Sequence, residues 1–439
     1  MVPHLKTALS GPLLELEQCF LAQSAWIEQW FRTSWLEHTP PVYASCDLRN
    51  AGFKLAPVDT NLFPGGFNNL NPDFLPLCVQ AMMVAVEKFC PAACKLLLIP
   101  ENHTRNLFYW QNVAHLALIL RRAGLDVRLG SFSPELVAPL TIELPYGQSL
   151  LLEPLARRGN RLELADFSPC MVLLNNDLSA GIPPILRDLE GQTLLPPLHA
   201  GWDTRRKSRH FAAYDEVARE FASLTGIDPW RINPAFAACQ GLDFRYRQGE
   251  EELADTVSRM LADIREKYRE HGITETPYVV VKADAGTYGM GVMTVKDASE
   301  IVGLNRRQRN RMSVVKEGLP VSEVIVQEGV HTYETVRDAV AEPVIYMIDR
   351  YVVGGFYRVH TARGKDENLN SPGMEFEPLA FETGCNLPDS GENPDAPPNR
   401  FYAYGVVGRL ACLAAAKELK ATETPREAET APSLMLASA

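Results

Sequence analysis

One stretch of the chain decides its fold: Tyr278-Val-Val-Val-Lys282-Ala-Asp284-Ala-Gly286-Thr-Tyr-Gly289-Met-Gly291-Val-Met-Thr-Val295. An apolar β-type run ends at Lys282, glycines interrupt the loop that follows, and Val292 begins a second β-type run. Glycine lets backbone N–H groups approach phosphate oxygens closely, and a lysine supplies a point charge for them. We therefore expect two strands joined by a glycine-rich loop that closes as a lid over a polyphosphate such as ATP.

The position of the lysine excludes other phosphate-binding motifs. A P-loop has its lysine after the glycines, and a dinucleotide-binding fold has its glycines at the start of a helix. A kinase-type loop places the lysine later, on the following strand. Here Lys282 precedes the loop, and a strand follows it. On the hairpin alone, an ordinary glycine-rich β-turn stays the alternative interpretation.

Composition sets broad limits on the kind of protein. A chain of 439 residues and 48.8 kDa predicts two or three packed modules. Its net charge of -11 argues against a nucleic-acid partner, because phosphate backbones need a basic face. The nine cysteines form no zinc-type pair, the N-terminus lacks a signal-peptide pattern, and no apolar run is long enough to span a bilayer. We expect a cytoplasmic protein without a membrane partner, and a homo-oligomer is left open.

The first half of the chain predicts an α/β layer. Apolar strands expected at 95–100 and 171–174 alternate with helices expected at 74–89 and 107–123. Such alternation is typical of a mainly parallel sheet, and ligands of these sheets lie beyond the carboxyl ends of the strands. Polar residues follow the expected strands at these ends, namely Asp47, Arg49, Glu101, His103, Arg105, Asn175, Asn176 and Asp177.

Two later segments add to the lysine–glycine hairpin. A strand ending at Gln327-Glu328, before Val330, can offer backbone groups to an adenine edge, and Glu328 can accept a ribose hydroxyl. A strand with Arg358 precedes a polar loop with Asn368, so the arginine can meet a transferred phosphate. Each segment alone is a weak signal. Their order along the chain, however, resembles that of the ATP-grasp superfamily.

A magnesium site is the least specific prediction. ATP-grasp enzymes usually hold Mg²⁺ on late strands that carry a Glu-x-Asn pair, and none follows the expected helix at 401–420. Glu375 and Glu377 alternate along a β-type run, which puts both carboxylates on one strand face. Mg²⁺ prefers oxygen ligands, so these two residues are the candidates, against the alternative of a solvated strand face.

The candidate substrate residues combine both signs of charge. Arginine forks suit carboxylates, while aspartate or asparagine suits an ammonium, so the mixture predicts a zwitterionic amino acid. A solvated start of a helix explains the basic run at 205–210 equally well. The candidates are Asp47, Arg49, Asn50, Lys54, Asn61, Arg205 and Arg206.

Taken together, these segments resemble the proteobacterial glutamate–cysteine ligases of ATP-grasp type. The resemblance covers residues 47–68, 201–210, 281–291, 367–373 and 399–405. It implies an α/β fold with α+β elements: an N-terminal α/β substrate domain with a mainly parallel sheet, similar to a pre-ATP-grasp domain, at 1–245. An ATP-grasp nucleotide-binding region at 246–421 and a disordered tail at 422–439 follow.

The resemblance also implies the reaction. ATP converts the γ-carboxylate of glutamate to an acyl phosphate, and the amine of cysteine displaces phosphate. The products are γ-glutamylcysteine, ADP and phosphate, and the reaction is the first step of glutathione biosynthesis. Lys282 and Arg358 would be catalytic, and Glu375 and Glu377 would hold Mg²⁺. Residues contacting ATP would be Lys282, Gly286, Gly289, Gly291, Gln327, Glu328, Val330 and Asn368.

Two alternatives stay open at this point. One is another ATP-grasp carboxylate–amine ligase, similar to glutathione synthetase or to an amino-acid or peptide ligase. The other is a nucleotide-binding regulatory protein without catalysis, which the missing Glu-x-Asn pair favours. Retention of Lys282, the glycines and Arg358 argues against it.

Overall fold

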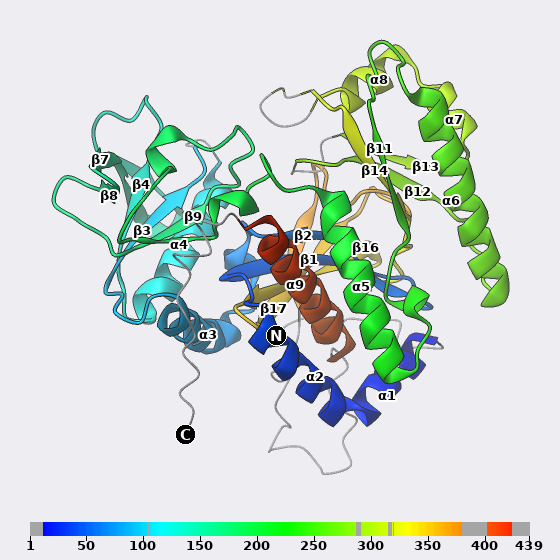
Figure 1. The fold of residues 1–439 in the computed structure, drawn as a ribbon, viewed down its shortest axis with the longest axis horizontal. Coiled ribbons are helices and arrows are strands. Elements are labelled where there is room, and N and C mark those ends of the chain that lie inside the picture. Colours follow the sequence, from blue (N-terminus) through cyan, green and yellow to red (C-terminus); the bar gives the residue numbers. More distant parts are fainter. Residues whose placement is uncertain are drawn as a thin grey trace.

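The computed structural model describes residues 12–102, 106–286, 291–314, 318, 320–379 and 402–423. Gly289, His103, Arg105 and residues 424–439 of the predicted disordered tail lie outside them. Within the described ranges the fold is mixed α/β, as predicted, and it contains several separate sheets (Figure 1). None of the helices in these ranges combines the length and apolar character needed to cross a membrane.

The sheet at the left of Figure 1 has the strand order β10-β9-β3-β4-β6-β5. The first four neighbouring pairs are parallel and β5–β6 is antiparallel. Leu96 to Ile99 are all buried, as expected of a parallel strand covered on both faces. The elements are β3 (Lys95–Pro100), β4 (Asp126–Ser131), β5 (Leu140–Glu143), β6 (Ser149–Pro154), β9 (Met171–Asn175), β10 (Thr193–Leu195), α3 (Leu75–Phe89) and α4 (Leu107–Arg122). A small hairpin, β7 (Ala156–Arg158) and β8 (Arg161–Glu163), extends from it.

The central sheet is antiparallel, with the order β18-β17-β16-β1-β2, and β15 pairs with β16. Its strands are β1 (Tyr43–Asn50), β2 (Leu55–Asn61), β15 (Thr335–Val336), β16 (Ala339–Ile348), β17 (Tyr351–His360) and β18 (Glu375–Pro378). β1 and β2 precede residue 245 and the others follow it, so this sheet crosses the predicted domain boundary, which stays a prediction.

Helices cover one face of the central sheet. The apolar helix α9 (Tyr402–Thr422) packs on β1, β2, β16 and β17, and α5 (Lys207–Thr225) packs against α9 (Figure 1). α1 (Pro12–Ala22) also contacts α9, and α2 (Ser24–Glu37) follows α1. Their apolar residues form one core with this face of the sheet. On the opposite face, part of β16 and β17 packs against α3.

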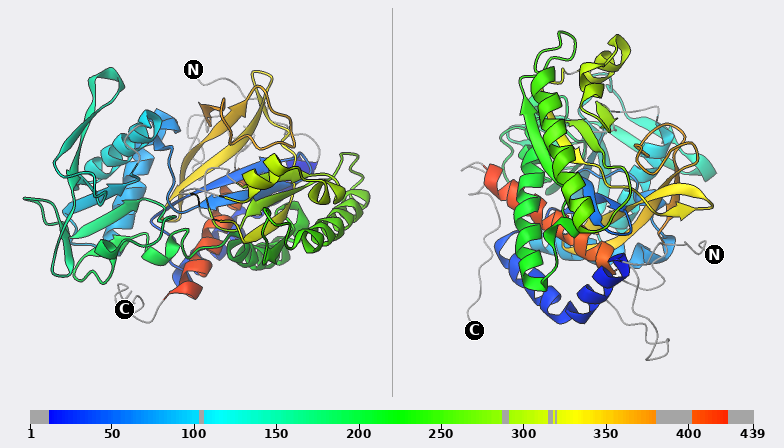
Figure 2. Two further views of the ribbon diagram at one scale, coloured as in Figure 1. Left: turned by 90° about the horizontal axis from the view of Figure 1, so that it is seen from above. Right: turned by 90° about the vertical axis from the view of Figure 1, so that its right-hand side faces the viewer.

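The expected lid hairpin belongs to a third sheet with the order β11-β14-β12-β13. As predicted, β12 (Val279–Ala283) and β13 (Val292–Val295) pair antiparallel, with Lys282 opposite Val292. The other elements of this lid sheet are β11 (Phe236–Gln240), β14 (Glu323–Glu328), α6 (Glu250–Glu270), α7 (Ser299–Val302) and α8 (Arg306–Met312). Helix α6 packs on β11, β12 and β14 and closes its core. Figure 2 shows this part and the parallel sheet on opposite sides of the central strands.

Candidate active site

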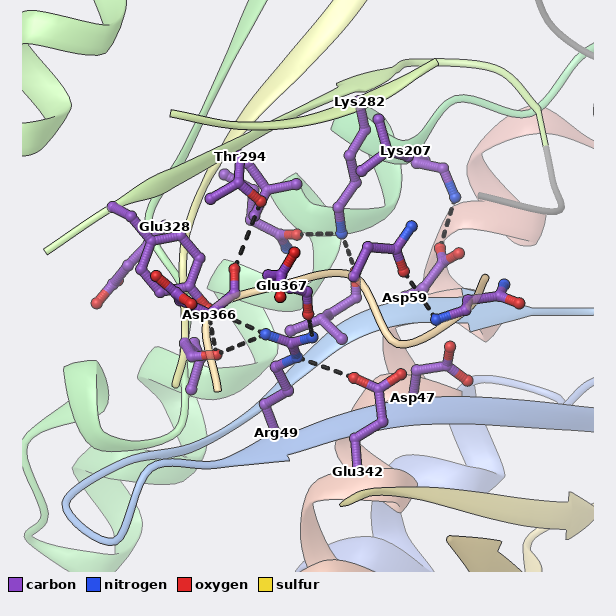
Figure 3. A pocket seen from close by; sticks show the side chains of 18 of the residues that line it. Asp47, Arg49, Asp59, Lys207, Lys282, Thr294, Glu328, Glu342, Asp366 and Glu367 are labelled. Atoms are coloured by element: carbon purple, nitrogen blue, oxygen red, sulfur yellow. Dashed lines mark hydrogen bonds and ion pairs between the residues drawn. The ribbon is translucent and has the colours of Figure 1, made fainter. Parts of the chain in front are cut away.

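A pocket lies between the lid sheet and the face of the central sheet that α9 does not cover (Figure 3). We call it the inter-sheet pocket. Both sheets contribute charged residues to it. Its lining residues are Asp47, Arg49, Val58, Asp59, Lys207, Tyr278, Val280, Lys282, Ala283, Gly286, Val292, Thr294, Gln327, Glu328, Val330, Glu342, Arg358, Asp366, Glu367, Asn368 and Asn370.

Lys282, the last but one residue of β12, reaches across this pocket. Its Nζ donates to the carbonyl of Val58, at 2.7 Å, and to Oε1 of Gln327, also at 2.7 Å. Burial lowers the pKa of Lys282 to about 8. Nε2 of Gln327 is buried and finds no partner among the described residues. The pocket wall therefore holds a cation and an unsatisfied donor, both of which suit an anionic ligand.

Register places three carboxylates and an arginine on one face of the central sheet. Glu342 lies opposite Arg358, and Asp47 lies opposite Asp59. Asp47 also lies opposite Val344, two residues after Glu342, and therefore shares its face. Alternation along each strand and pairing between strands thus bring these charges together without any sequence motif.

Arg358 is clamped between two of these carboxylates. Its Nη1 donates to Oδ2 of Asp47, at 2.9 Å, and to Oε1 of Glu342, at 2.5 Å. Arg49 donates from Nε to the other oxygen of Glu342, at 2.9 Å. Burial alone would raise the pKa of Glu342, but the two arginines outweigh it and keep that pKa below its ordinary value. Nε of Arg358 has no partner in the part of the chain that the structure describes.

Asp59 faces the two lysines of the pocket. Nζ of Lys207 lies 2.6 Å from its Oδ1. Burial would raise the pKa of Asp59, yet Lys207 and Lys282 hold it at about 2. Lys207 is the first residue of α5, and the Asp284 carboxylate fixes this helix start by accepting from N and Oγ of Ser208, at 2.7 and 2.6 Å. The end of β12 and the start of α5 are thereby held together at the pocket.

Arg49 joins the floor of the pocket to the lid sheet. Its Nη1 donates to the hydroxyl of Tyr278, at 3.0 Å, and to the carbonyl of Val330, at 3.2 Å. Any side chain at Gly329 would overlap the ring of Tyr278, with a Cβ only 2.2 Å from it. The glycine therefore makes room for this tyrosine. Because the Val330 carbonyl already has two donors, this carbonyl is a poorer adenine contact than predicted.

A polar loop closes one side of the pocket. Asp366, Glu367 and Asn368 line it, and the loop is tied to β13 by Oγ1 of Thr294, which donates to the carbonyl of Asp366 at 3.4 Å. Lys296 forms an ion pair with Asp366, while Arg363 pairs with Glu367 at 3.0 Å. The negative charges of Asp366 and Glu367 are thus neutralised by cations outside the pocket. The interior keeps Asp47, Asp59 and Glu342 among four cations.

Glu328 lines the pocket, but its carboxylate points to other partners. Lys54 forms an ion pair with its Oε2 at 2.7 Å, and Nε1 of Trp230 donates to Oε1 at 3.0 Å. The backbone N–H of Ala235 also donates to Oε2, at 2.9 Å. This carboxylate is therefore engaged, which argues against the predicted ribose contact. Lys54 is fully buried beside it and does not line the inter-sheet pocket.

Other predicted substrate residues also lie outside the pocket. Nδ2 of Asn50 donates to the hydroxyl of Tyr404, at 2.9 Å, on the α9 side of the sheet. Arg205 pairs with Glu418 of α9 at 3.0 Å, and Arg206 pairs with Glu323 at 3.0 Å. Oδ1 of Asn61 accepts from the N–H of Phe63, at 2.9 Å, within its own turn. Each of these polar groups has a structural partner. Gly291 is likewise not a lining residue; its φ of 60° shapes the hairpin turn.

Glu375 and Glu377 are not brought to the pocket. On the edge strand β18 they lie opposite Val359 and Tyr357, whereas Phe376 lies opposite Arg358. Since paired residues share a face, both carboxylates are on the face away from Arg358. Glu375 is exposed, and Glu377 forms an ion pair with Arg337. The two glutamates do lie on one face of a strand, but this face points away from the inter-sheet pocket.

Several pocket residues had no place among the predicted site residues: Asp59, Lys207, Tyr278, Thr294, Glu342, Asp366, Glu367 and Asn370. For Glu342 and Asp59 a signal existed. A carboxylate within the otherwise buried run of β16, or beside Asn61 on β2, is costly unless it is paired or binds a ligand. Only the register of the sheet connects them with Arg358.

Comparison with known proteins gives independent evidence on the family of this protein. The family model of glutamate–cysteine ligase matches residues 17–419. The chain belongs to the glutamate–cysteine ligase family. It is also similar to a solved structure from Methylobacillus flagellatus KT, provisionally named a gamma-glutamylcysteine synthetase, with 67% sequence identity and a TM-score of 0.88. That match covers 96% of this chain and 100% of the other. A comparison with curated proteins found no match.

Membership of the family confirms the predicted activity. This glutamate–cysteine ligase joins glutamate to cysteine at the expense of ATP, in glutathione biosynthesis. The alternative of a regulatory protein without catalysis is therefore not needed to explain the missing Glu-x-Asn pair. The family match does not identify the residues that carry out the reaction, so their roles are inferred from the geometry of the pocket.

Proposed function

We propose that the inter-sheet pocket is the place where the ligase activates glutamate with ATP. The arrangement of two antiparallel sheets around one charged pocket supports an ATP-grasp site. The lid sheet contributes Lys282 and Gly286, and the central sheet contributes Arg358. One observation supports the proposal above all: these cations line the same pocket as Asp47, Asp59 and Glu342. In that pocket, Nε2 of Gln327 and Nε of Arg358 have no hydrogen-bond partner among the described residues.

The chemistry explains why such a pocket is needed. A carboxylate does not lose oxide, so an oxygen of the γ-carboxylate attacks the γ-phosphorus of ATP, and ADP leaves. The amine of cysteine then attacks the acyl carbon, and phosphate leaves. The protein mainly positions the reactants and neutralises charge. Lys282 is placed to hold the phosphates of ATP, and the unpaired Nε of Arg358 is placed to donate to the phosphoryl group in transfer.

The donor set of the pocket fits Mg²⁺. Asp47, Asp59 and Glu342 carry carboxylates on one sheet face, which suits a hard cation that keeps several waters. Mg²⁺ would replace part of their present ion pairs with Arg358, Lys207 and Arg49. We assign the metal to these residues in place of Glu375 and Glu377. When bound, Mg²⁺ would neutralise the phosphate oxygens of ATP. The low pKa of Asp59 keeps its carboxylate ionised.

We also propose where the enzyme acts and what its two larger sheets do. The eight cysteines in the described part of the chain are free thiols, which supports a reducing compartment such as the cytoplasm. We keep the N-terminal parallel sheet as a substrate-binding part of the enzyme. The central sheet, which contains strands from both sides of residue 245, then belongs to the nucleotide site.

The acyl phosphate gives a direct test. With ATP labelled by ¹⁸O at the β,γ-bridge, reversible transfer to glutamate moves the label to a non-bridging β-oxygen without cysteine present. We expect glutamate-dependent scrambling in the wild type and its loss in Lys282→Ala. Scrambling that is equal in the two proteins would contradict the proposed role of the pocket.

A further inference from the structure

The strand that carries Asp59 needs support from outside the central sheet. β2 is the last strand in the order of that sheet, with β1 as its neighbour among the described strands. The register pairs Asp47 with Asp59 but Leu48 with Pro57, so Val58 is left without an opposite residue. Such a bulge locally disrupts the ladder of hydrogen bonds. The conformation of β2 around Asp59 therefore depends on other partners.

Two cations bind the backbone of β2, one on each side of Asp59. Nζ of Lys282 donates to the carbonyl of Val58, and Nη1 of Arg205 donates to the carbonyl of Thr60, each at 2.7 Å. Lys282 lines the inter-sheet pocket, whereas Arg205 does not. Arg205 therefore acts on the segment around Asp59 from outside the pocket.

Arg205 is itself held by helix α9. Its Nε donates to both carboxylate oxygens of Glu418, at 3.0 and 3.1 Å. Nδ1 of His210 lies 3.1 Å from Oε2 of the same carboxylate, and all three side chains are buried. The guanidinium of Arg205 thus bridges Glu418 and the carbonyl of Thr60. Helix α9 is thereby connected to the residue that follows Asp59.

Residues 202–207 also direct a lysine to Asp59. Trp202 is buried, and the centre of its ring lies 5.0 Å from Cζ of Arg205 and 4.5 Å from Nζ of Lys207. Cations at this distance are attracted by the face of an aromatic ring. Nζ of Lys207 in turn pairs with Oδ1 of Asp59, at 2.6 Å. The segment therefore contacts both the carboxylate of Asp59 and the backbone next to it.

We infer that Glu418 and Arg205 are positioning residues for the metal site. Through the carbonyl of Thr60 they fix the backbone of β2, and with it the direction in which Asp59 presents its carboxylate. The inference rests on the proposed function, which assigns Mg²⁺ to Asp59 and two further carboxylates. Removing a group that orients a metal ligand typically weakens metal binding by about 10- to 100-fold.

The experiment has to separate positioning from simple stabilisation of the fold. Removing one member of a buried ion pair leaves an unpaired charge and is strongly destabilising, whereas removing both charges is often neutral. The double variant Arg205→Met with Glu418→Gln removes both charges and the contact to Thr60. Glutamine keeps a polar partner for His210. The double variant should therefore unfold close to the wild-type temperature.

The quantity to measure is the Kd of Mn²⁺, used in place of Mg²⁺, with a non-hydrolysable ATP analogue present. Electron paramagnetic resonance of the free ion reports it without any turnover. We expect the Kd to rise about tenfold or more in the double variant. The matched control is another ion pair of α9, between the buried Arg409 and Glu28, at 2.8 Å. Arg409→Met with Glu28→Gln should keep the wild-type Kd, because this pair joins α9 to α2 instead of β2.

A wild-type Kd in the folded double variant would overturn the inference. An equal rise in the control variant would overturn it too, since the effect would then come from loosening α9. If the double variant does not fold, Arg205→Lys decides, because its point charge can pair with Glu418 but lacks the fork that also reaches Thr60. Arg205→Lys should weaken Mn²⁺ binding severalfold, and an unchanged Kd would overturn the inference.

Asp59→Asn separates this inference from the proposed function. If Asp59→Asn weakens Mn²⁺ binding and the double variant does not, the inference fails while the metal assignment stands. If Asp59→Asn binds Mn²⁺ as tightly as the wild type does, the metal assignment itself is refuted, and the inference with it.

Discussion

Two carboxylates on opposite faces of the central sheet are buried in opposite ways. On the pocket face, Glu342 is held between Arg49 and Arg358, and its pKa is lowered. On the α9 face, Glu334 is surrounded by uncharged groups, with Tyr404 and Asn50 as its hydrogen-bond donors. Burial raises the pKa of Glu334 to about 7. The two faces of the sheet therefore keep one of these carboxylates charged and favour the neutral form of the other.

This difference shows that burial alone does not mark the site. A neutral acid such as Glu334, among tyrosines, contributes to packing. Several charged residues around one cavity, by contrast, are suited to bind a charged ligand. On the pocket face the unpaired group is an N–H of a guanidinium, which remains charged at any physiological pH. The following four predictions test this contrast, from the largest expected effect to the smallest.

Arg358→Ala should reduce kcat by about a thousandfold or more, the range found for arginines that stabilise a transferred phosphoryl group. Arg358→Lys keeps the charge but loses the planar fork, so it should recover only part of the rate. The assay is ADP release with saturating glutamate and cysteine. Arg337→Ala is the matched control, because Arg337 pairs with Glu377 away from the pocket. Equal activity of Arg358→Ala and this control would remove Arg358 from the mechanism.

Asp59→Asn and Glu342→Gln should each raise the Mg²⁺ concentration needed for half-maximal rate, by about tenfold or more. Each change removes a charged oxygen from the proposed metal set. Glu375→Gln and Glu377→Gln serve as controls on the other face and should behave as wild type. The assignment fails if the Mg²⁺ requirement changes in the control pair and stays the same in the first pair.

The affinity for ATP should weaken as pH rises through about 8, the pKa of Lys282. Below that pH the ammonium is charged and attracts phosphate; above it the charge is lost, and the Kd should rise by up to about tenfold per pH unit. Calorimetry with a non-hydrolysable ATP analogue between pH 7 and 9.5 measures this. Lys282→Arg stays charged and should flatten the profile.

Lys54 offers a control for the pH experiment. Burial lowers its pKa to about 8 as well, but it pairs with Glu328 and does not line the pocket. Lys54→Arg should therefore keep the wild-type dependence of ATP affinity on pH. If Lys54→Arg flattens the profile and Lys282→Arg does not, the titrating group has been assigned to the wrong lysine.

Glu334→Gln should change the pH dependence of stability rather than activity. The pKa of this carboxyl is raised from 4.5 to about 7 in the folded state, so the folded protein binds the extra proton between these values. Stability is then lost as pH rises through about 7. Thermal unfolding from pH 5 to 8 should show a drop of a few degrees, roughly that of 1 kcal/mol or more, which the glutamine variant lacks. An equal drop in both proteins would assign it to other groups.

The sequence allowed the lid hairpin and half of the site to be predicted, for local reasons. Lys282 and Gln327 lie on strands and Gly286 lies in the loop after β12, and the structure brings them into one pocket with Arg358, Asp47 and Arg49. The pattern of one strand or of its adjoining loop was enough to propose each of them. The family resemblance supplied the activity, which the family match confirms.

The rest depended on sheet register, which sequence spacing does not determine. The N-terminal strands β1 and β2 pair beside β16, and this pairing brings Asp47 and Asp59 close to Glu342 and Arg358. The expectation of metal ligands on late strands therefore led to Glu375 and Glu377, whereas two of the carboxylates that we propose for the metal, Asp47 and Asp59, lie near the start of the chain. Arg205 and Asn50 were predicted to bind substrate but bind other residues of the protein instead. In a sequence, polar residues with such internal partners look the same as residues that bind a ligand.

The most direct measurement is the anomalous scattering of Mn²⁺ in crystals of the enzyme with a non-hydrolysable ATP analogue. We expect the metal within coordination distance of at least two of Asp47, Asp59 and Glu342, and the phosphates within hydrogen-bond distance of Nζ of Lys282. A metal bound at Glu375 and Glu377, or phosphates far from Lys282, would contradict the account.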